Sequence, residues 1–114
     1  MKQIIVIRKD LKMRMGKAVA QGAHASMAVA VNNMKDPRVT FWLSGKFTKV
    51  VVYVNSEEEL LKVYDEALAR GLLASLIVDE GLTEFKLVPT KTAVAIGPDF
   101  PEKLTPVTGH LPLL

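Results

Sequence analysis

Two runs of apolar residues that do not alternate with polar ones constrain the fold of this chain most. The first is Ile-Ile-Val-Ile at 4–7, and the second is Val-Val-Val-Tyr-Val at 50–54. A strand with one face in water alternates apolar and polar residues, whereas a strand covered on both faces reads as a continuous apolar run. We therefore expect strands at 3–8 and 47–54 in a sheet that carries helices on both faces.

The segments between and after these strands complete the pattern β-α-β-α-β-β. Ser56 and Glu59 form a capping box that opens a helix, and Gly71 is a typical stop for it. The other expected elements are a helix at 16–35 that ends before Asp36-Pro37, a helical turn or loop at 38–45, strands at 73–78 and 92–97, and a short helix near 101–104. The predicted fold is a single α/β domain over 1–114, a three-layer α/β/α sandwich with a mixed four-stranded sheet.

Length and composition exclude several classes of protein. A chain of 114 residues that is 49% hydrophobic and 24% charged fits one globular domain. Without cysteine it has no disulfide, no thiolate nucleophile and no Cys-built metal site. No apolar run approaches the roughly 18 residues of a membrane span, and the short apolar stretch at the N-terminus reads as a strand, not a signal peptide. We expect a soluble cytoplasmic protein.

The positive charge is concentrated at the N-terminus. Residues 1–17 contain six basic residues and one acid, whereas acids outnumber bases in the remainder. A local basic segment indicates an anionic partner, with nucleic acid or a phosphate first among the candidates. A solvated loop explains the same charges almost as well. The candidate phosphate ligands are Arg8, Lys9, Lys12 and Arg14.

A polar stripe crosses the expected first helix, whose other residues are mostly small or apolar. Lys17, Gln21 and His24 recur at helical spacing and point in similar directions. Lys17 falls in the first turn, where the helix dipole disfavours a cation, so it needs either water or a nearby anion. Such a stripe also arises from ordinary packing, with His24 as a satisfied histidine at an interface.

A candidate anion for Lys17 lies at the end of the third strand. Asp79 comes directly after an apolar run, and ligands collect at the carboxyl ends of strands in open α/β sheets. If the first and third strands run in the same direction, Asp79 faces the loop that leads to Lys17. Together they could hold both charges and orient a water. The alternative is an ordinary turn, since Asp and Gly are common turn formers.

The last strand carries two threonines. Strict alternation places Thr90 and Thr92 on one face and Lys91 on the other, although threonine also suits strands for steric reasons alone. His24 and His110 do not form a recognised metal-binding pattern, and the sequence has no glycine-rich phosphate loop.

Two blocks of sequence resemble the type 2 peptidyl-tRNA hydrolases. The segment DLKMRMGKAVAQGAHAS at 10–26 is similar to that family's Gly-Lys-x-x-Ala-Gln-x-x-His-Ala signature. The segment VDEGLTEFKLVPTKTAVAIGP at 78–98 is similar to its second block, with an Asp-x-Gly-x-Thr turn, a Thr-x-Thr strand and an Ile-Gly-Pro ending. The tail at 106–114 also matches. The resemblance thus covers nearly the whole chain.

The resemblance implies an esterase that cleaves the bond between a peptide and the 3′ end of tRNA, with no metal or organic cofactor. Its substrate is peptidyl-tRNA, its role is tRNA recycling, and members of the family often form homodimers. The family's functional positions fall on Lys17, Gln21, His24, Asp79, Thr83 and Thr92. The sequence departs from the usual Met-Gly-Lys-Gly-Lys in reading Met-Arg-Met-Gly-Lys at 13–17, where Arg14 replaces a glycine and Met15 a lysine. The alternative function is a non-catalytic module that binds RNA or a partner protein.

Overall fold

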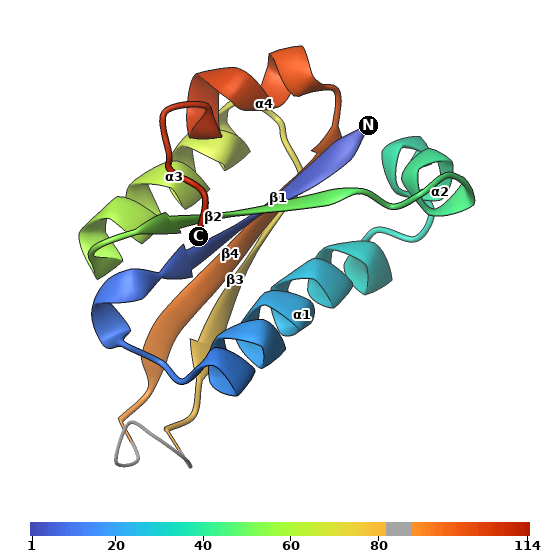
Figure 1. Cartoon of the computed structure of the whole chain (residues 1–114). Coiled ribbons are helices and arrows are strands. Elements are labelled where there is room, and N and C mark those ends of the chain that lie inside the picture. Colours follow the sequence, from blue (N-terminus) through green and yellow to red (C-terminus); the bar gives the residue numbers. More distant parts are fainter. Residues whose placement is uncertain (82–87) are drawn as a thin grey trace.

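The computed structural model describes residues 1–81 and 88–114. The chain forms a four-stranded sheet, and Figure 1 shows the strands lying between helices on either side. The elements in chain order are β1 (Lys2–Arg8), the short 3-10 helix η1 (Lys9–Leu11), α1 (Met15–Asn32), α2 (Pro37–Ser44), β2 (Lys49–Val54), α3 (Glu57–Ala69), β3 (Ala74–Asp79), β4 (Thr90–Asp99) and α4 (Pro101–Thr108). This order confirms the predicted succession of helices and strands, with α2 in the segment that the sequence left open.

The sheet has the strand order β2-β1-β4-β3. Strand β1 is parallel to β2 and antiparallel to β4, and β4 is antiparallel to β3. The sheet is therefore mixed, and β1 and β3 run in the same direction although β4 separates them. Their carboxyl ends meet at one edge, where Figure 1 also places η1 and the start of α1. This edge is where the sequence predicts the site.

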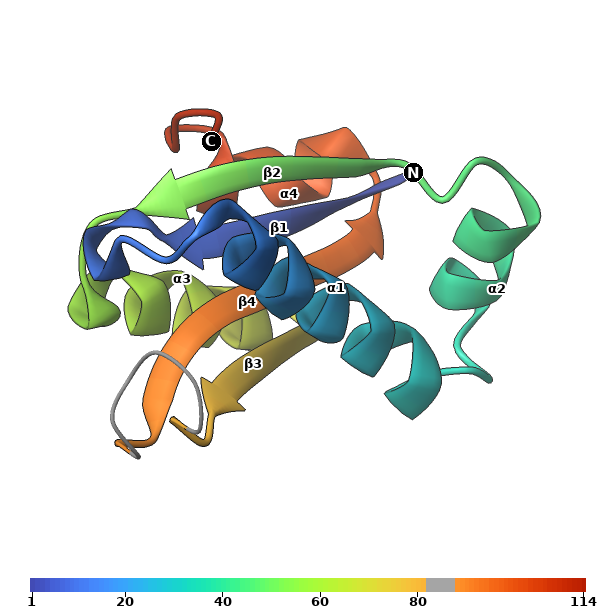
Figure 2. The same cartoon turned by 60° about the horizontal axis from the view of Figure 1, so that its bottom comes forward.

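Helices cover both faces of the sheet, which confirms the three-layer prediction. On one face, alternate residues of β1 and β4 pack with α3 and α4 around fully buried Val6, Ile96 and Leu60. On the other face, Ile5 and Ile7 pack against small and β-branched residues of α1. Figure 2 shows α1 running diagonally across this second face. The apolar run of β1 is thus buried from both sides. Strand β2 lies at the edge of the sheet and its Val51 is exposed, so the expectation of a helix on both faces was wrong for this strand.

The first long helix is shorter than predicted. Helix α1 ends at Asn32, where the sequence suggested a helix up to residue 35. The Asn33 side chain donates a hydrogen bond to the Val29 carbonyl and competes with a further helical turn. Asp36 then caps α2 by accepting from the backbone N–H of Arg38, and Pro37 occupies the first turn, where its missing N–H costs nothing.

Strand β4 contains a β-bulge that the sequence did not predict. Ile77 pairs with Ala93 and Val78 pairs with Lys91, so one step along β3 corresponds to two steps along β4. Thr92 is the extra residue. A bulge interrupts alternation and re-aims a side chain. Thr92 accordingly points toward α1, as its neighbour Ala93 does, so alternation is interrupted between these two residues. The pairing of Thr90 with Asp79 and of Lys91 with Val78 agrees with the predicted placement of the two threonines on one face and Lys91 on the other.

None of the helices in the described part of the chain has the length and apolar character needed to cross a bilayer.

Candidate active site

An ion pair joins the start of α1 to the end of β3. The Lys17 ammonium donates to Asp79 Oδ1 at 2.7 Å, and the two side chains are only 14% and 13% exposed. Sixty-two positions separate the two residues in the chain, and the common direction of β1 and β3 brings them together. The cation in the first turn of α1 thus has a carboxylate partner, which offsets the unfavourable helix dipole there.

Both oxygens of the Asp79 carboxylate accept hydrogen bonds. The backbone N–H of Gly81 donates to Oδ2 at 2.9 Å, in a turn where Gly81 has φ +79°. The hydrogen bond from Lys17 holds the pKa of the Asp79 carboxyl below its ordinary value of 3.8, against an opposing effect of burial, and the Gly81 bond adds to the lowering. Asp79 is therefore ionised at neutral pH. The sequence indicated the turn but did not identify the Gly81 amide as a donor.

A second polar pair lies one helical turn farther along α1. The Thr92 hydroxyl donates to the Gln21 side-chain oxygen at 2.5 Å, and both residues are buried. Because residues four apart stack on the same helix flank, Gln21 continues the line that Lys17 begins. The structure thus brings together Lys17 with Asp79 and Gln21 with Thr92, four of the six positions expected to carry chemistry.

The remaining two positions are His24 and Thr83. His24 is exposed, so the interpretation of a histidine packed at an interface is wrong. It lies on the Lys17 flank of α1, and its positive charge when protonated adds a small effect that lowers the pKa of Asp79. Thr83 lies outside the described residues.

The side chains of the basic segment differ in their exposure and in their partners. Lys12 and Arg14 are exposed, and Lys9 places its ammonium 4.4 Å from the centre of the Tyr53 ring. Arg8 is different, because its side chain is only 11% exposed and its guanidinium is bound by Asp10 and by the Lys91 carbonyl. The sequence grouped Arg8 with the phosphate ligands, but its surroundings are those of a structural arginine.

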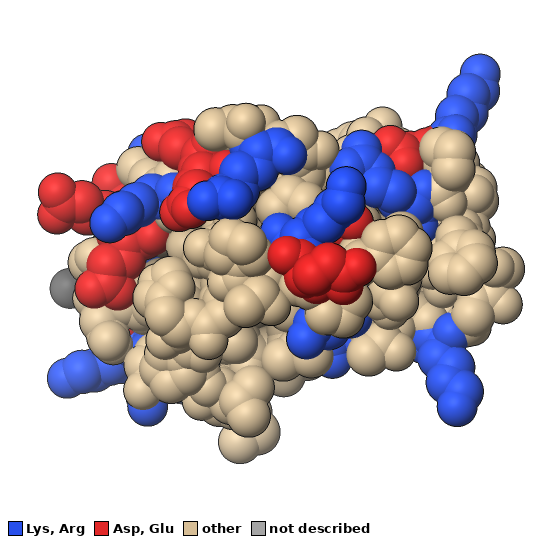
Figure 3. Space-filling view, turned by 90° about the horizontal axis from the view of Figure 1, so that it is seen from above, with Lys and Arg blue, Asp and Glu red and all other residues tan. Residues whose placement is uncertain are grey.

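Among the described residues, the face that carries α4 has no comparable basic segment. On the face that carries α4, Figure 3 shows lysine and arginine side chains intermingled with acidic ones. Mixed charges give little net attraction for a polyanion. The basic segment between β1 and α1 is therefore the better candidate for contacts with phosphates.

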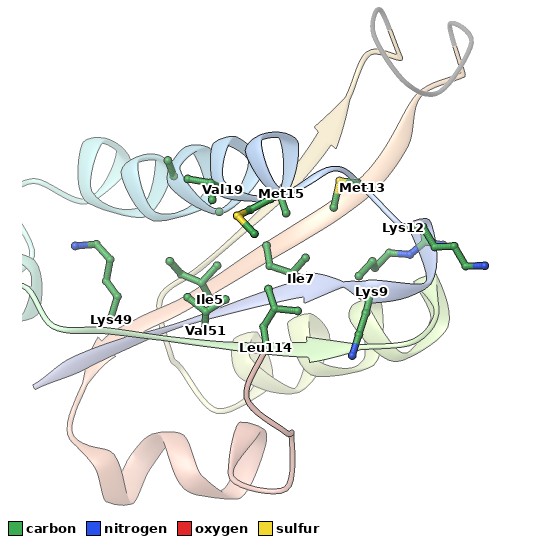
Figure 4. A pocket seen from close by; sticks show the side chains of 14 residues that line it. Ile5, Ile7, Lys9, Lys12, Met13, Met15, Val19, Lys49, Val51 and Leu114 are labelled. Atoms are coloured by element: carbon green, nitrogen blue, oxygen red, sulfur yellow. The ribbon is translucent and has the colours of Figure 1, made fainter.

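An apolar groove lies on the other flank of α1 from Lys17. It has a volume of about 860 Å³, and its floor is formed by β1 and β2, which α1 leaves partly uncovered. Figure 4 shows Met15 and Val19 of α1 facing Ile7 and Val51 across it. Around its rim lie Lys9, Lys12 and Lys49. The helix therefore has a polar flank toward Asp79 and an apolar flank toward the groove.

Residues 1–81 and 88–114 contain no group of three or more His, Cys, Asp or Glu side chains arranged to hold a metal ion.

These groups can assist the hydrolysis of an ester. A lysine ammonium held by an ion pair can stabilise negative charge on a carbonyl or leaving oxygen, and the free lone pairs of the carboxylate can orient a water.

Comparisons with known proteins give one consistent result. The family described as peptidyl-tRNA hydrolase PTH2 matches residues 1–114. A peptidyl-tRNA hydrolase of Methanocaldococcus jannaschii is 49% identical over the full length of both chains. Peptidyl-tRNA hydrolases of Methanococcus vannielii and Thermoplasma acidophilum are 43% and 37% identical, with at least 97% of each chain covered.

The ion pair predicts a loss of stability in acid. Because the pKa of Asp79 is lower in the folded chain than its ordinary 3.8, the unfolded state binds more protons near that pH. The free energy of unfolding should fall as pH drops through 3.8 toward the lowered pKa, and Lys17→Met should reduce this fall. Urea unfolding of both proteins between neutral pH and acid measures it. A difference between the two proteins that does not shrink in acid would contradict the role of the pair.

Proposed function

Because the chain belongs to the PTH2 family of peptidyl-tRNA hydrolases, we propose that it hydrolyses the ester between a peptide and the 3′ oxygen of tRNA, with the site around Lys17 and Asp79 as its active site. The observation that carries this proposal is the partly buried 2.7 Å ion pair, formed by two residues on which the family's motifs fall. The reaction recycles tRNA, and we assign it to the cytoplasm because its substrate is a product of translation.

In the proposed mechanism, water attacks the acyl carbon directly. The new carbon–oxygen bond forms as the bond to the 3′ oxygen breaks, and one proton of the water ends on that leaving oxygen. Lys17 stabilises the negative charge that develops on the substrate oxygens. Asp79 holds the Lys17 ammonium in place and accepts a hydrogen bond from the water. Its lowered pKa makes it a weak base, which favours orientation of the water over full removal of its proton.

The second polar pair supports the first. Gln21 accepts the proton of the Thr92 hydroxyl, and because Thr92 is fully buried, this bond holds Gln21 in a fixed orientation one helical turn from Lys17. Thr83 belongs to the proposed set through its place in the Asp-x-Gly-x-Thr motif. His24, exposed on the same flank, would contact the substrate beside the Lys17–Asp79 pair.

We assign contacts with the tRNA phosphates to Lys9, Lys12 and Arg14. These side chains follow β1 at the edge of the sheet that holds the ion pair, and Lys12 and Arg14 are well exposed. Lys12 also has φ +53°, a conformation that glycine or asparagine adopts at lower cost. A lysine at this position is easier to explain by its charge than by its backbone.

We also propose that the chain forms a homodimer through the exposed side of α1 and α2. Met15, Val19, Met27 and Val31 recur every four or eight residues along α1, and each is more than half exposed. The line continues into a second apolar hollow of about 310 Å³ between α1 and α2, lined by Met34, Leu43 and Phe47. Apolar surface of this extent is typical of an interface, and a two-fold axis would let the same surface cover itself.

Substitutions at the ion pair should abolish catalysis without unfolding the protein. Lys17→Ala and Asp79→Ala should each lower kcat by about 10²- to 10³-fold, because each removes stabilisation of the transition state. Release of free peptide from a model peptidyl-tRNA measures the rate, and circular dichroism checks the fold. The matched controls Lys62→Ala and Asp65→Ala change exposed residues of α3 and should leave kcat unchanged. If the wild-type chain bound the substrate without releasing peptide, it would be a binding module and not an enzyme.

Loss of a phosphate ligand should weaken binding and leave the saturated rate intact. Lys12→Gln and Arg14→Gln should raise KM and reduce the slope of log KM against log salt by about one each. The control Lys62→Gln removes the same charge from α3 and should leave the slope unchanged. A fall in kcat with no change in KM would argue against the assignment of phosphate contacts to these two residues.

A charge placed on the exposed side of α1 should dissociate the dimer. Val19→Glu and Met27→Glu each bring two like charges into the two-fold interface, and sedimentation velocity should then show monomers. Leu68→Glu adds the same charge at a 48% exposed leucine of α3 and should leave the dimer intact. A wild-type chain that sediments as a monomer would rule out the homodimer.

A further inference from the structure

Arg8 has no free nitrogen on its guanidinium group. Nε and Nη2 donate to the two oxygens of Asp10 at 3.2 and 2.8 Å, and Nη1 donates to the Lys91 carbonyl at 3.0 Å. Glu57, in the first turn of α3, lies 3.8 Å from Nη1. The side chain is only 11% exposed. With three of its five N–H groups engaged and the carboxylates of Asp10 and Glu57 beside it, the guanidinium is poorly placed to bind a phosphate.

The carbonyl that Arg8 holds belongs to the β-bulge of β4. Main-chain pairing between β1 and β4 extends to Ile7 and Ala93, and the bulge that follows contains Lys91 and Thr92. Beyond that last pair, the side-chain bond from Arg8 continues the link between the two strands. Arg8 therefore connects the end of β1 to the bulged residues.

The bulge decides which way Thr92 points. Without it, alternation from Ala93 would turn Thr92 toward the face of α3, and Gln21 would lose the hydroxyl that it accepts from. With it, the hydroxyl lies on the face of α1, one helical turn from Lys17. A contact that keeps Lys91 in place thus also keeps the Thr92 hydroxyl directed at Gln21.

We infer that Arg8 is a positioning residue that, clamped by Asp10, fixes the bulge at Lys91 and Thr92 and so aims the Thr92 hydroxyl at Gln21. This inference rests on the proposed function of the site around Lys17 and Asp79. It assigns to Arg8 a role in the geometry of catalysis in place of a contact with tRNA. Lysine cannot replace it, because a single ammonium cannot bind both carboxylate oxygens side by side and also reach the Lys91 carbonyl.

The decisive variant is Arg8→Lys, which keeps the charge. It should lower kcat by about tenfold or more, since small displacements of positioned groups are costly, while KM and its salt dependence stay as in the wild type. In a Thr92→Val background the same substitution should have little further effect, because the hydroxyl that it positions is already gone. The Thr92 methyl resonance should shift in Arg8→Lys. A wild-type kcat in Arg8→Lys would overturn the inference.

Asp10→Asn distinguishes a positioning role of Arg8 from a phosphate-binding role, because the two roles predict different changes in kcat and KM. If Arg8 positions the bulge, weakening its clamp should lower kcat. If Arg8 binds phosphate, removing a competing negative charge should lower KM and leave kcat unchanged, and that result would overturn the inference. Lys62→Gln serves as the control for a change of one charge, and melting temperatures of all variants show that the rates refer to folded protein. Activity of Lys17→Ala tests the proposed active site itself, so failure of the proposed function is distinguishable from failure of this inference.

Discussion

The Lys17–Asp79 ion pair is the interaction on which the proposed function depends. A lysine in the first turn of a helix opposes the helix dipole, and a carboxylate at the end of a covered strand loses hydration. Each group offsets the unfavourable energy of the other, because the Lys17 ammonium and Asp79 Oδ1 are 2.7 Å apart and both side chains are little exposed. The result is a pair that stays charged at neutral pH, in a place where charge interacts more strongly than it does in water.

Topology makes that pair possible. Strands β1 and β3 are not neighbours, but the antiparallel strand β4 between them gives them a common direction. The loop after β1 and the turn after β3 consequently open on the same edge. The same central strand carries the bulge at Thr92. Strand β4 therefore both separates β1 from β3 and supplies the hydroxyl that binds Gln21. Small changes in its pairing would reach the site directly.

Helix α1 contributes to three surfaces, namely the core, the flank of Lys17 and the apolar groove. Its buried side is made of small residues, and Gly22 lets the helix lie close to Ile5 and Ile7 of the sheet. One flank carries Lys17 and Gln21 toward β3 and β4, while the other borders the apolar groove. Close packing without large side chains keeps the helix fixed, so the polar pairs can hold their geometry. The same helix can therefore contribute to catalysis and to association without conflict.

The sequence alone determined the layers, the order of the elements and the residues of the ion pair, because apolar runs, caps and turn residues act locally and the motifs mark the chemistry. It did not determine the end of α1, where Asn33 competes with the helix, or the exposure of His24, which depends on how α1 lies on the sheet. Strand order, the bulge that turns Thr92 toward Gln21 and the burial of Arg8 were decided only by tertiary structure. Each of these depends on pairing between segments far apart in the chain, and neither the spacing nor the composition of a single segment contains that information.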